Sequence, residues 1–531
     1  MSHQPRERLR RRSAPRSRNG CPTCKARHVK CDETRPACLR CTESGRVCDG
    51  YPQPQVRRGG LSQTSLGIRQ YDLPYKVAGS QEDRLLLHYF CASAASELSG
   101  YLSSDFWTRL VLQVGEHEQV VRQAVVSLSS LHLELTTAPA RHGDEVGPVQ
   151  PGGPQSISHG TVVQYNKAMR SLRKYMNDLP EDGMSRHDAA LPVLICSVLF
   201  YCFESARGDS AAAQQHLESG LAIIRGAMCR KDMPRSTPDI EELLQIFRRL
   251  DLQASMADDQ RLPILISTPC PLDICTVDQL VGDLPFTSLR QAQAILTKLE
   301  SRVLGFLISN NQYKFYAAEE LPPWLVEQKA LYAEQYDKWS VFFDEFTAQQ
   351  VHPSTCAMAE FQSATLMLRI HYRIMLLLLQ SSFPNDLSIF APSPADPSKS
   401  AIAKVLEDAR SIIEANDRPE GKRMSFSAET GVIAPLFLIA MKSGDLNIIC
   451  QARLLLASSK RREGPYDTEM AGDILEGMMA FSNDFQGRPP SDMMYEDGST
   501  MPLEYSGIHV LDSSVGLDGI ARSLGAMRHV A

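Results

Sequence analysis

Six cysteines lie within residues 21–48, and their spacing is the strongest chemical signal in this chain of 531 residues. The pattern C-x2-C-x6-C occurs twice, seventeen positions apart, at Cys21, Cys24, Cys31, Cys38, Cys41 and Cys48. A C-x2-C pair brings two sulfurs to one metal ion across a tight turn, and the third cysteine returns about two helical turns later. Two tetrahedral zinc ions need about eight sulfur bonds, so six thiolates suffice if one from each half bridges both ions. The spacing therefore predicts a compact cluster of two zinc ions.

The same cysteines could instead form a three-disulfide framework in a secreted protein. The stretch before Cys21 has no apolar signal-peptide core, and no N-x-S/T sequon occurs in the chain. The other eight cysteines, spread from residue 91 to residue 450, show no paired spacing. A reducing compartment, and with it metal binding, is the better interpretation.

Charge divides the chain into a basic head and an acidic body. Residues 1–60 hold fifteen Lys and Arg against five Asp and Glu, a balance of +10. The remainder holds 41 basic and 57 acidic residues, a balance of −16, which gives the whole chain its −6. Six thiolates with two Zn²⁺ ions carry a charge of about −2, so the basic side chains both offset the cluster and present positive potential to a polyanion such as DNA.

The segment between Cys24 and Cys31 reads KARHVK and contains neither Gly nor Pro. We expect it to form a short helix that zinc ligands hold at both ends, since it is too short to persist alone. At helical spacing Lys25 lies near His28, and Arg27 lies near Lys30. Such an exposed basic helix suits the DNA major groove, where Lys and Arg donate to guanine. A merely solvated charged face is the alternative.

The cysteines, the RHVKCDE at 27–33, Pro36 between the halves and the CDGY at 48–51 resemble the fungal binuclear zinc-cluster transcription factors. The resemblance implies that Cys21 and Cys38 bridge the two zinc ions and that Pro36 holds the connecting loop. It also implies reading of CGG-like triplets through a lysine of the first half, where this chain has His28. The candidate DNA contacts are Lys25, Arg27, His28 and Lys30, with Arg40 expected on phosphate.

Two segments flank the cluster domain, which we place at residues 20–51. Residues 1–19 form an Arg-rich arm, expected to be disordered and typical of a nuclear import signal, a DNA-clamping arm or a solubilising tail. Residues 52–79 form a linker without the a/d heptads of a coiled coil. We therefore expect either monomeric DNA binding or a homodimer formed through the large domain.

The fold class is mainly α: a small zinc-cluster domain with two short metal-pinned helices is joined by a flexible linker to a large all-helical regulatory domain at 80–480. An irregular tail is expected at 481–531. SQED at 80–83 has the form of a helix-capping box. Helical patterns follow at 106–114, 118–135, 159–176, 189–205, 210–226, 240–257 and 357–380. The order of motifs from LLLHYF (85–90) to the segment ending at 226 resembles the fungal-specific transcription factor domain. In the tail, acidic and bulky apolar residues mix at 485–505, a composition found in activation segments and in ordinary irregular tails.

Other classes of protein receive little support. The apolar run from Ala189 to Phe203 is too short for a membrane span and includes Pro192. No phosphate-binding loop, G-x-S-x-G elbow or H-E-x-x-H motif occurs, so catalysis is not expected. His88, His132 and His216 are expected to pack or to lie on the surface.

Two hypotheses follow. The first is a nuclear, sequence-specific DNA-binding regulator of RNA polymerase II transcription that works with the transcription machinery or co-regulators. The alternative is a zinc-cluster interaction scaffold or co-regulator without direct sequence-specific DNA binding. The basic arm and the basic helix favour the first.

Overall fold

The computed structural model describes residues 20–51, 79–102, 104–137, 156–179, 187–229, 237–258, 261–265, 280–350, 355–391, 400–416 and 425–486. The chain divides into two compact units, residues 1–68 and 69–531, which are described one at a time. The predicted basic arm, nearly all of the linker and most of the tail lie outside the described residues.

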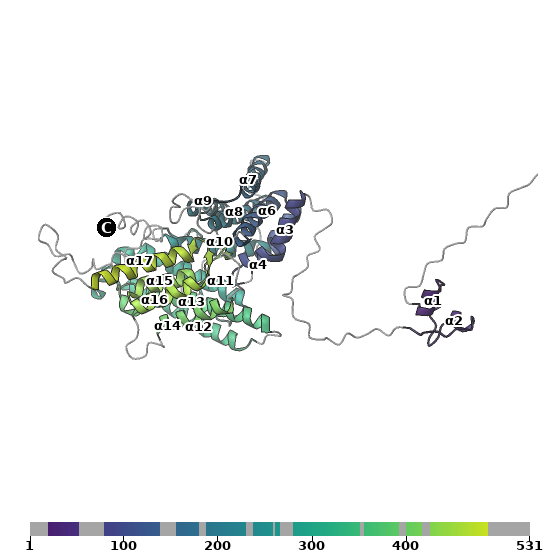
Figure 1. Cartoon of the computed structure of the whole chain (residues 1–531). Helices are drawn as coiled ribbons and strands as arrows, with labels where there is room; N and C mark the ends of the chain where they lie inside the picture. Colours follow the sequence, from purple (N-terminus) through teal and green to yellow (C-terminus); the bar gives the residue numbers. More distant parts are fainter. Residues whose placement is uncertain are drawn as a thin grey trace, which may run out of the picture. The chain divides into compact units, whose positions relative to one another are not determined.

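The first unit contains two short helices, as predicted for the cluster domain (Figure 1). Helix α1 spans Pro22–Ala26 and α2 spans Leu39–Thr42, so each helix begins directly after the first cysteine of its half. Pro22 suits the first position of α1, because that position needs no backbone N–H donor. The remaining described residues of this unit form turns and extended chain.

The second unit is built mainly from helices, which confirms the predicted fold class. Its first half holds the short π-helical segments η1 (Phe90–Ala94) and η2 (Phe106–Leu110) together with helices that match the predicted apolar patterns. These helices are α3 (Gln81–Tyr89), α4 (Ala95–Leu98), α5 (Val111–His117), α6 (Gln119–Thr137), α7 (His159–Asp178), α8 (His187–Arg207), α9 (Ser210–Cys229) and α10 (Pro238–Ala257).

The predicted capping box at the start of α3 is confirmed. Ser80 Oγ accepts from the Asp83 N–H at 3.1 Å, and the Asp83 carboxylate accepts from the Ser80 N–H at 3.2 Å. The Asp83 carboxylate also accepts a hydrogen bond from Lys167 Nζ of α7, at 3.0 Å. One local sequence signal therefore starts a helix and also ties it to a distant one.

The second half of this unit contains helices for which the sequence patterns gave one range only, 357–380, which lies within α13. Three 3₁₀ turns accompany them: η5 (Asn311–Tyr313), η6 (Ala318–Glu320) and η7 (Leu387–Phe390). The helices are α11 (Leu289–Ser309), α12 (Pro323–Ala348), α13 (Thr355–Gln380), α14 (Ala401–Ala415), α15 (Ile433–Ser443), α16 (Leu446–Ser458) and α17 (Thr468–Gln486). Because α17 runs to Gln486, the irregular tail does not begin at residue 481 as predicted.

The description of this domain as all-helical needs one correction. Three short strands form a sheet in the order β1 (Ser425–Ser427), β2 (Arg461–Glu463), β3 (Tyr466–Asp467). β1 pairs with β2 in parallel, and β2 pairs with β3 as an antiparallel hairpin. Glu463 is fully buried and accepts the N–H groups of Gly431 and Ile433 at 2.9 Å each. The sheet thus caps the start of α15, and strands this short lack the length for an alternating sequence pattern.

Buried apolar side chains form three cores in the second unit. The first core joins α3 to α10 and includes Phe106, Trp107, Phe200 and Phe247. The second core joins α13 to α17, and the third joins α11, α12 and α13 around Trp339. Figure 1 shows α3 to α10 in colours from purple-blue to teal and α12 to α17 in colours from green to yellow within this unit. Helix α13 contributes to both the second and the third core.

Helix α8 is apolar because it is buried. Its apolar segment extends beyond Phe203 to Arg207, so the expectation that it is too short for a membrane span was wrong by length and mean hydropathy, but 83% of the most apolar window is buried inside the fold. On the neighbouring helix α9, Gly220 allows close packing against α10, because a Cβ there would come within 2.5 Å of the Phe247 ring. A buried core helix explains the apolar run.

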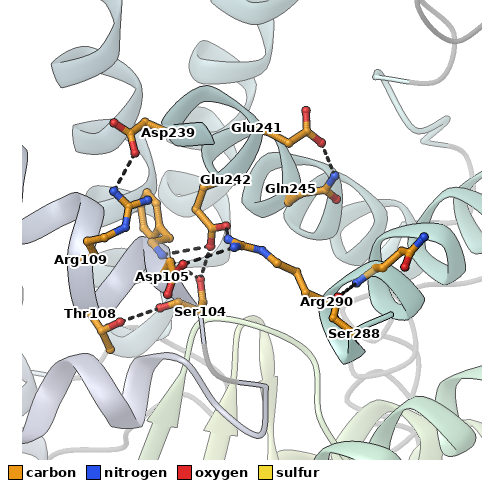
Figure 2. A network of polar contacts seen from close by, with 12 residues as sticks. Ser104, Asp105, Thr108, Arg109, Asp239, Glu241, Glu242, Gln245, Ser288 and Arg290 are labelled. Atoms are coloured by element: carbon orange, nitrogen blue, oxygen red, sulfur yellow. Dashed lines mark hydrogen bonds and ion pairs between the residues drawn. The ribbon is translucent and has the colours of Figure 1, made fainter. Parts of the chain in front are cut away.

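A polar network joins the beginnings of η2, α10 and α11 (Figure 2). The Glu242 side chain is 3% exposed, and its carboxylate accepts hydrogen bonds from Ser104 Oγ and from the Phe106 N–H, each at 3.0 Å. Arg290 of α11 pairs with the same carboxylate and lies 3.3 Å from Asp105. Beside them Arg109 pairs with Asp239 at 2.7 Å. These contacts hold three segments that are distant in sequence in one arrangement.

Candidate metal centre

The six cysteine sulfurs lie together in two overlapping groups of four. One group holds Cys21, Cys24, Cys31 and Cys38, the other holds Cys21, Cys38, Cys41 and Cys48, and the sulfurs of each group lie within 4.8 Å of one another. All except Cys48 are buried, and none of the six forms a disulfide. The arrangement does not support the disulfide alternative.

The sulfur separations fit zinc. Cys38 Sγ lies 3.7 Å from Cys21 Sγ, 3.6 Å from Cys24 Sγ and 3.9 Å from Cys48 Sγ. A tetrahedron with zinc–sulfur bonds of about 2.3 Å has an edge of about 3.8 Å. Cys21 and Cys38 belong to both groups, which is the sharing that two tetrahedral ions require of six sulfurs. Soft thiolate ligands in this geometry select zinc over magnesium or calcium.

The two halves repeat each other in backbone conformation at the seventeen-residue offset. In the first half the Val29 N–H donates to the Cys24 carbonyl at 3.1 Å, and in the second half Arg46 donates to Cys41 at 3.0 Å. The residue before each donor has a left-handed backbone, His28 with φ 55° and Gly45 with φ 67°. Each helix therefore ends in the same reversal, a Schellman-type C-cap.

This reversal overturns the prediction of one helix across residues 25–30. Helix α1 ends at Ala26, and Arg27 and His28 form its C-terminal cap. The pairing of Lys25 with His28 and of Arg27 with Lys30 at helical spacing is accordingly wrong. The KARHVK segment contains no Gly or Pro to signal a stop, and the need to return Cys31 to the cluster ends the helix.

Each half also supports the helix of the other half. Asp32 accepts the N–H groups of Leu39 at 2.9 Å and Arg40 at 3.0 Å, at the start of α2. Asp49, seventeen residues later, accepts the Thr23 hydroxyl at 2.6 Å, at the start of α1. These crossed caps position Cys24 and Cys41, and they were not among the predicted site residues. The matching offset of the two aspartates was the available signal.

Tyr51 closes the loop between the halves. Its hydroxyl donates to the Thr34 carbonyl at 2.9 Å and lies 3.6 Å from Cys31 Sγ. The Arg35 guanidinium lies over the Tyr51 ring at 5.1 Å. Pro36, expected to hold this loop, follows a cis peptide bond.

The candidate DNA contacts are all exposed, namely Lys25, Arg27, His28, Lys30 and Arg40. Lys25 lies on α1, His28 and Lys30 follow its end, and Arg40 lies on α2. Arg27 Nη1 donates to Ser44 Oγ of the second half at 3.0 Å, so one of its guanidinium donors is already used within the protein. Arg46 is a further exposed basic residue that the sequence analysis did not name.

Family comparisons agree with this geometry. Residues 19–58 match the fungal Zn(2)-Cys(6) binuclear cluster domain, and residues 84–315 match the fungal specific transcription factor domain. No solved structure matches the chain.

Similar curated proteins carry related descriptions. The aspercryptin biosynthesis cluster-specific transcription regulator of Emericella nidulans is 26% identical over 410 residues, 70% of this chain and 60% of that protein. A transcription regulator of Purpureocillium lilacinum is 24% identical, over 58% of this chain and 78% of its own length. A transcriptional regulatory protein of Schizosaccharomyces pombe is 40% identical over 99 residues, 18% of each chain. Cluster geometry, both domain matches and these relatives agree, and the chain belongs to the fungal Zn(2)-Cys(6) binuclear-cluster transcription factors.

Proposed function

We propose that this protein is a nuclear regulator of RNA polymerase II transcription that binds double-stranded DNA at CGG-like triplets. The observation that carries the proposal is the pair of cysteine groups sharing Cys21 and Cys38, with exposed basic residues beside them. The site would hold two zinc ions, whose chemistry here is structural. Bound zinc would keep α1 and α2 folded, since helices this short are unstable alone.

The residues divide by what they would contact. Lys25, Arg27, His28 and Lys30 belong to the first half and are the candidates for DNA contact, with no base assigned to any of them; Lys or Arg that reaches a guanine would donate to its N7 and O6. Arg40 would contact phosphate, a contact that positions the protein without reading sequence. Asp32 and Asp49 face helix starts and would only shape the site.

Zinc-dependent DNA binding tests the proposal. The full-length protein is titrated into labelled duplexes with one CGG triplet, two triplets at varied spacing, or a scrambled site, with fluorescence anisotropy as readout. We expect tighter binding to CGG duplexes, and loss of that preference after zinc chelation and its return on adding zinc. Binding that ignores sequence or chelation would instead support the alternative, an interaction scaffold or co-regulator.

His28 separates base reading from general attraction to DNA. His28→Lys adds a full positive charge where the family usually has lysine, so we expect tighter binding or a changed triplet preference. Lys30→Ala should weaken binding to all duplexes alike, with a smaller salt dependence. Glu43→Gln, on the exposed end of α2, is the matched control. Unchanged affinity and preference in both variants would contradict the assignment.

Assembly on DNA belongs to the same proposal. A homodimer would form through the helical domain, and the duplexes with two triplets test this because a dimer prefers one spacing. Co-regulators or the transcription machinery would bind the helical domain or the segment at 485–505. A reporter assay with and without residues 485–505 measures whether that segment activates.

A further inference from the structure

A small cavity lies inside the helical domain where its three cores meet. Its volume is about 50 Å³, and its walls come from α10, α11, α13 and the segment before α15. Leu252 and Leu368 on its wall belong to the third core, and Met367 belongs to the second. Gln253, also on the wall, donates to Tyr201 of the first core at 2.8 Å. Such a volume holds a few water molecules or a ligand of a few non-hydrogen atoms.

Two polar side chains that line this cavity, Glu300 and His371, are not fully satisfied by the protein itself. The Glu300 side chain of α11 is 5% exposed, and its closest ion-pair contact is His371 Nδ1 of α13, at 3.8 Å. That separation is too long for a hydrogen bond. On the same ring, His371 Nε2 is shielded from solvent and has no partner. The His371 ring also has a backbone hydrogen bond with Gly431, whereas the nearest charged partner of the buried Glu300 carboxyl lies beyond hydrogen-bond distance. Buried polar groups are normally paired, so Glu300 points to a partner that the protein itself does not supply.

The other charged groups around the cavity are already matched. Arg249 makes two bonds to the Glu429 carboxylate, at 2.7 and 2.9 Å. Tyr336 of α12 lies close enough for Glu300 to help burial raise the pKa of its hydroxyl. Because Arg249 is committed, the cavity has no free cation to bind an anion. It has an unmatched carboxyl group instead.

Burial keeps both unmatched groups neutral near pH 7. It raises the pKa of Glu300 to about 8 and lowers the pKa of His371 to about 4. A positive charge placed beside Glu300 would favour the carboxylate over the protonated acid. The neutral imidazole nitrogen is an acceptor at the same place.

We propose that this cavity binds the ammonium group of a small primary amine, with Glu300 as its counter-ion. The ammonium donates to the Glu300 carboxylate and to His371, while Leu102, Met256 and Leu296 of the wall contact the alkyl chain. The proton that leaves Glu300 passes to solvent, so the ion pair that forms is neutral overall. Since its wall residues belong to the second and third cores and Gln253 bonds to Tyr201 of the first, an occupied site would bias how the three cores pack.

Calorimetry on the full-length, zinc-loaded protein tests this proposal. Propylammonium is titrated at pH 7 in two buffers of different ionisation enthalpy, with 1-propanol as the neutral probe of the same shape. We expect binding of the amine with release of nearly one proton per chain, and much weaker binding of the alcohol. Above pH 8 the proton release should disappear, because Glu300 is then already ionised.

Substitution tests whether Glu300 is the group that binds the amine. Glu300→Gln keeps the size of the side chain and should weaken amine binding by at least about tenfold, with no proton release. Glu345→Gln, at an exposed position of α12, should bind as the original protein does. Circular dichroism checks that both variants fold.

Several results would contradict the proposed amine-binding site. They are equal binding of the alcohol, binding unchanged in Glu300→Gln, heats independent of buffer, or no binding in the millimolar range. If Glu300→Gln fails to fold, proton release by the original protein still decides the question. No DNA is used, so this experiment fails or succeeds independently of the proposed function.

Discussion

At the scale of single residues, position in the seventeen-residue repeat determines backbone conformation more strongly than residue type does. His28 and Gly45 occupy equivalent left-handed positions, although only Gly adopts that conformation at little cost. The chain must return to Cys31, and this imposes the left-handed backbone at His28. That backbone conformation sets the direction in which the His28 side chain leaves the chain. The family resemblance implies a lysine at this position, where this chain has His28, and the structure adds this constraint on its backbone.

Asp32 offers a test of the crossed caps. Asp32→Ala removes the acceptor for the Leu39 and Arg40 N–H groups and for the Thr34 hydroxyl. We expect zinc affinity to fall about tenfold or more, because groups that hold metal ligands in place typically matter by that amount. Competition with a chromogenic chelator measures it. Glu43→Ala is the control, and equal zinc affinity in the two variants would show that the cap is unimportant.

At the scale of elements, buried polar groups decide how helices meet. Helix periodicity explains α6, α7 and α10, but it does not show that Glu242 of α10 faces Ser104 and Arg290 (Figure 2). A glutamate near a helix start is normally read as a favourable dipole interaction. Here it is buried, because it satisfies the N–H of Phe106 at the start of η2.

Glu242→Ala should therefore destabilise the helical domain. Two hydrogen bonds to a charged acceptor are lost and the Phe106 N–H keeps only its weaker contact with Ser104 Oγ at 3.2 Å, at a cost of about 2 kcal/mol. The contact with the half-exposed Arg290 adds little, since solvent screens it. Urea unfolding followed by circular dichroism measures the change. The neighbouring Glu241→Ala, at an exposed site, should cost less than about 0.5 kcal/mol, and a similar loss in both would refute the role of Glu242.

At the scale of the whole molecule, the two units depend on different physics. The cluster unit has a core made of cysteines with Tyr51 packed against it, so it depends on metal. The helical unit buries three apolar cores and contains no candidate metal group among its described residues. Their stabilities should therefore respond separately to zinc.

Zinc removal tests that separation. With chelator present, we expect the thermal midpoint of the helical unit to stay within about 2 °C, since no metal holds it together. Helical circular dichroism should fall only slightly, because α1 and α2 contribute few of the helical residues. DNA binding should disappear under the same conditions. A large fall in the midpoint would show that the units stabilise each other.

The sequence by itself determined the cysteine cluster, the mainly helical body and the capping box of α3. Each depends on short-range patterns: ligand spacing, apolar periodicity and one turn of hydrogen bonds. Only the tertiary structure showed the end of α1 at Ala26, the crossed caps of Asp32 and Asp49, the sheet at 425–467 and the cavity around Glu300. These features join residues that are distant along the chain, and a local pattern carries no record of which distant groups meet when the cores close.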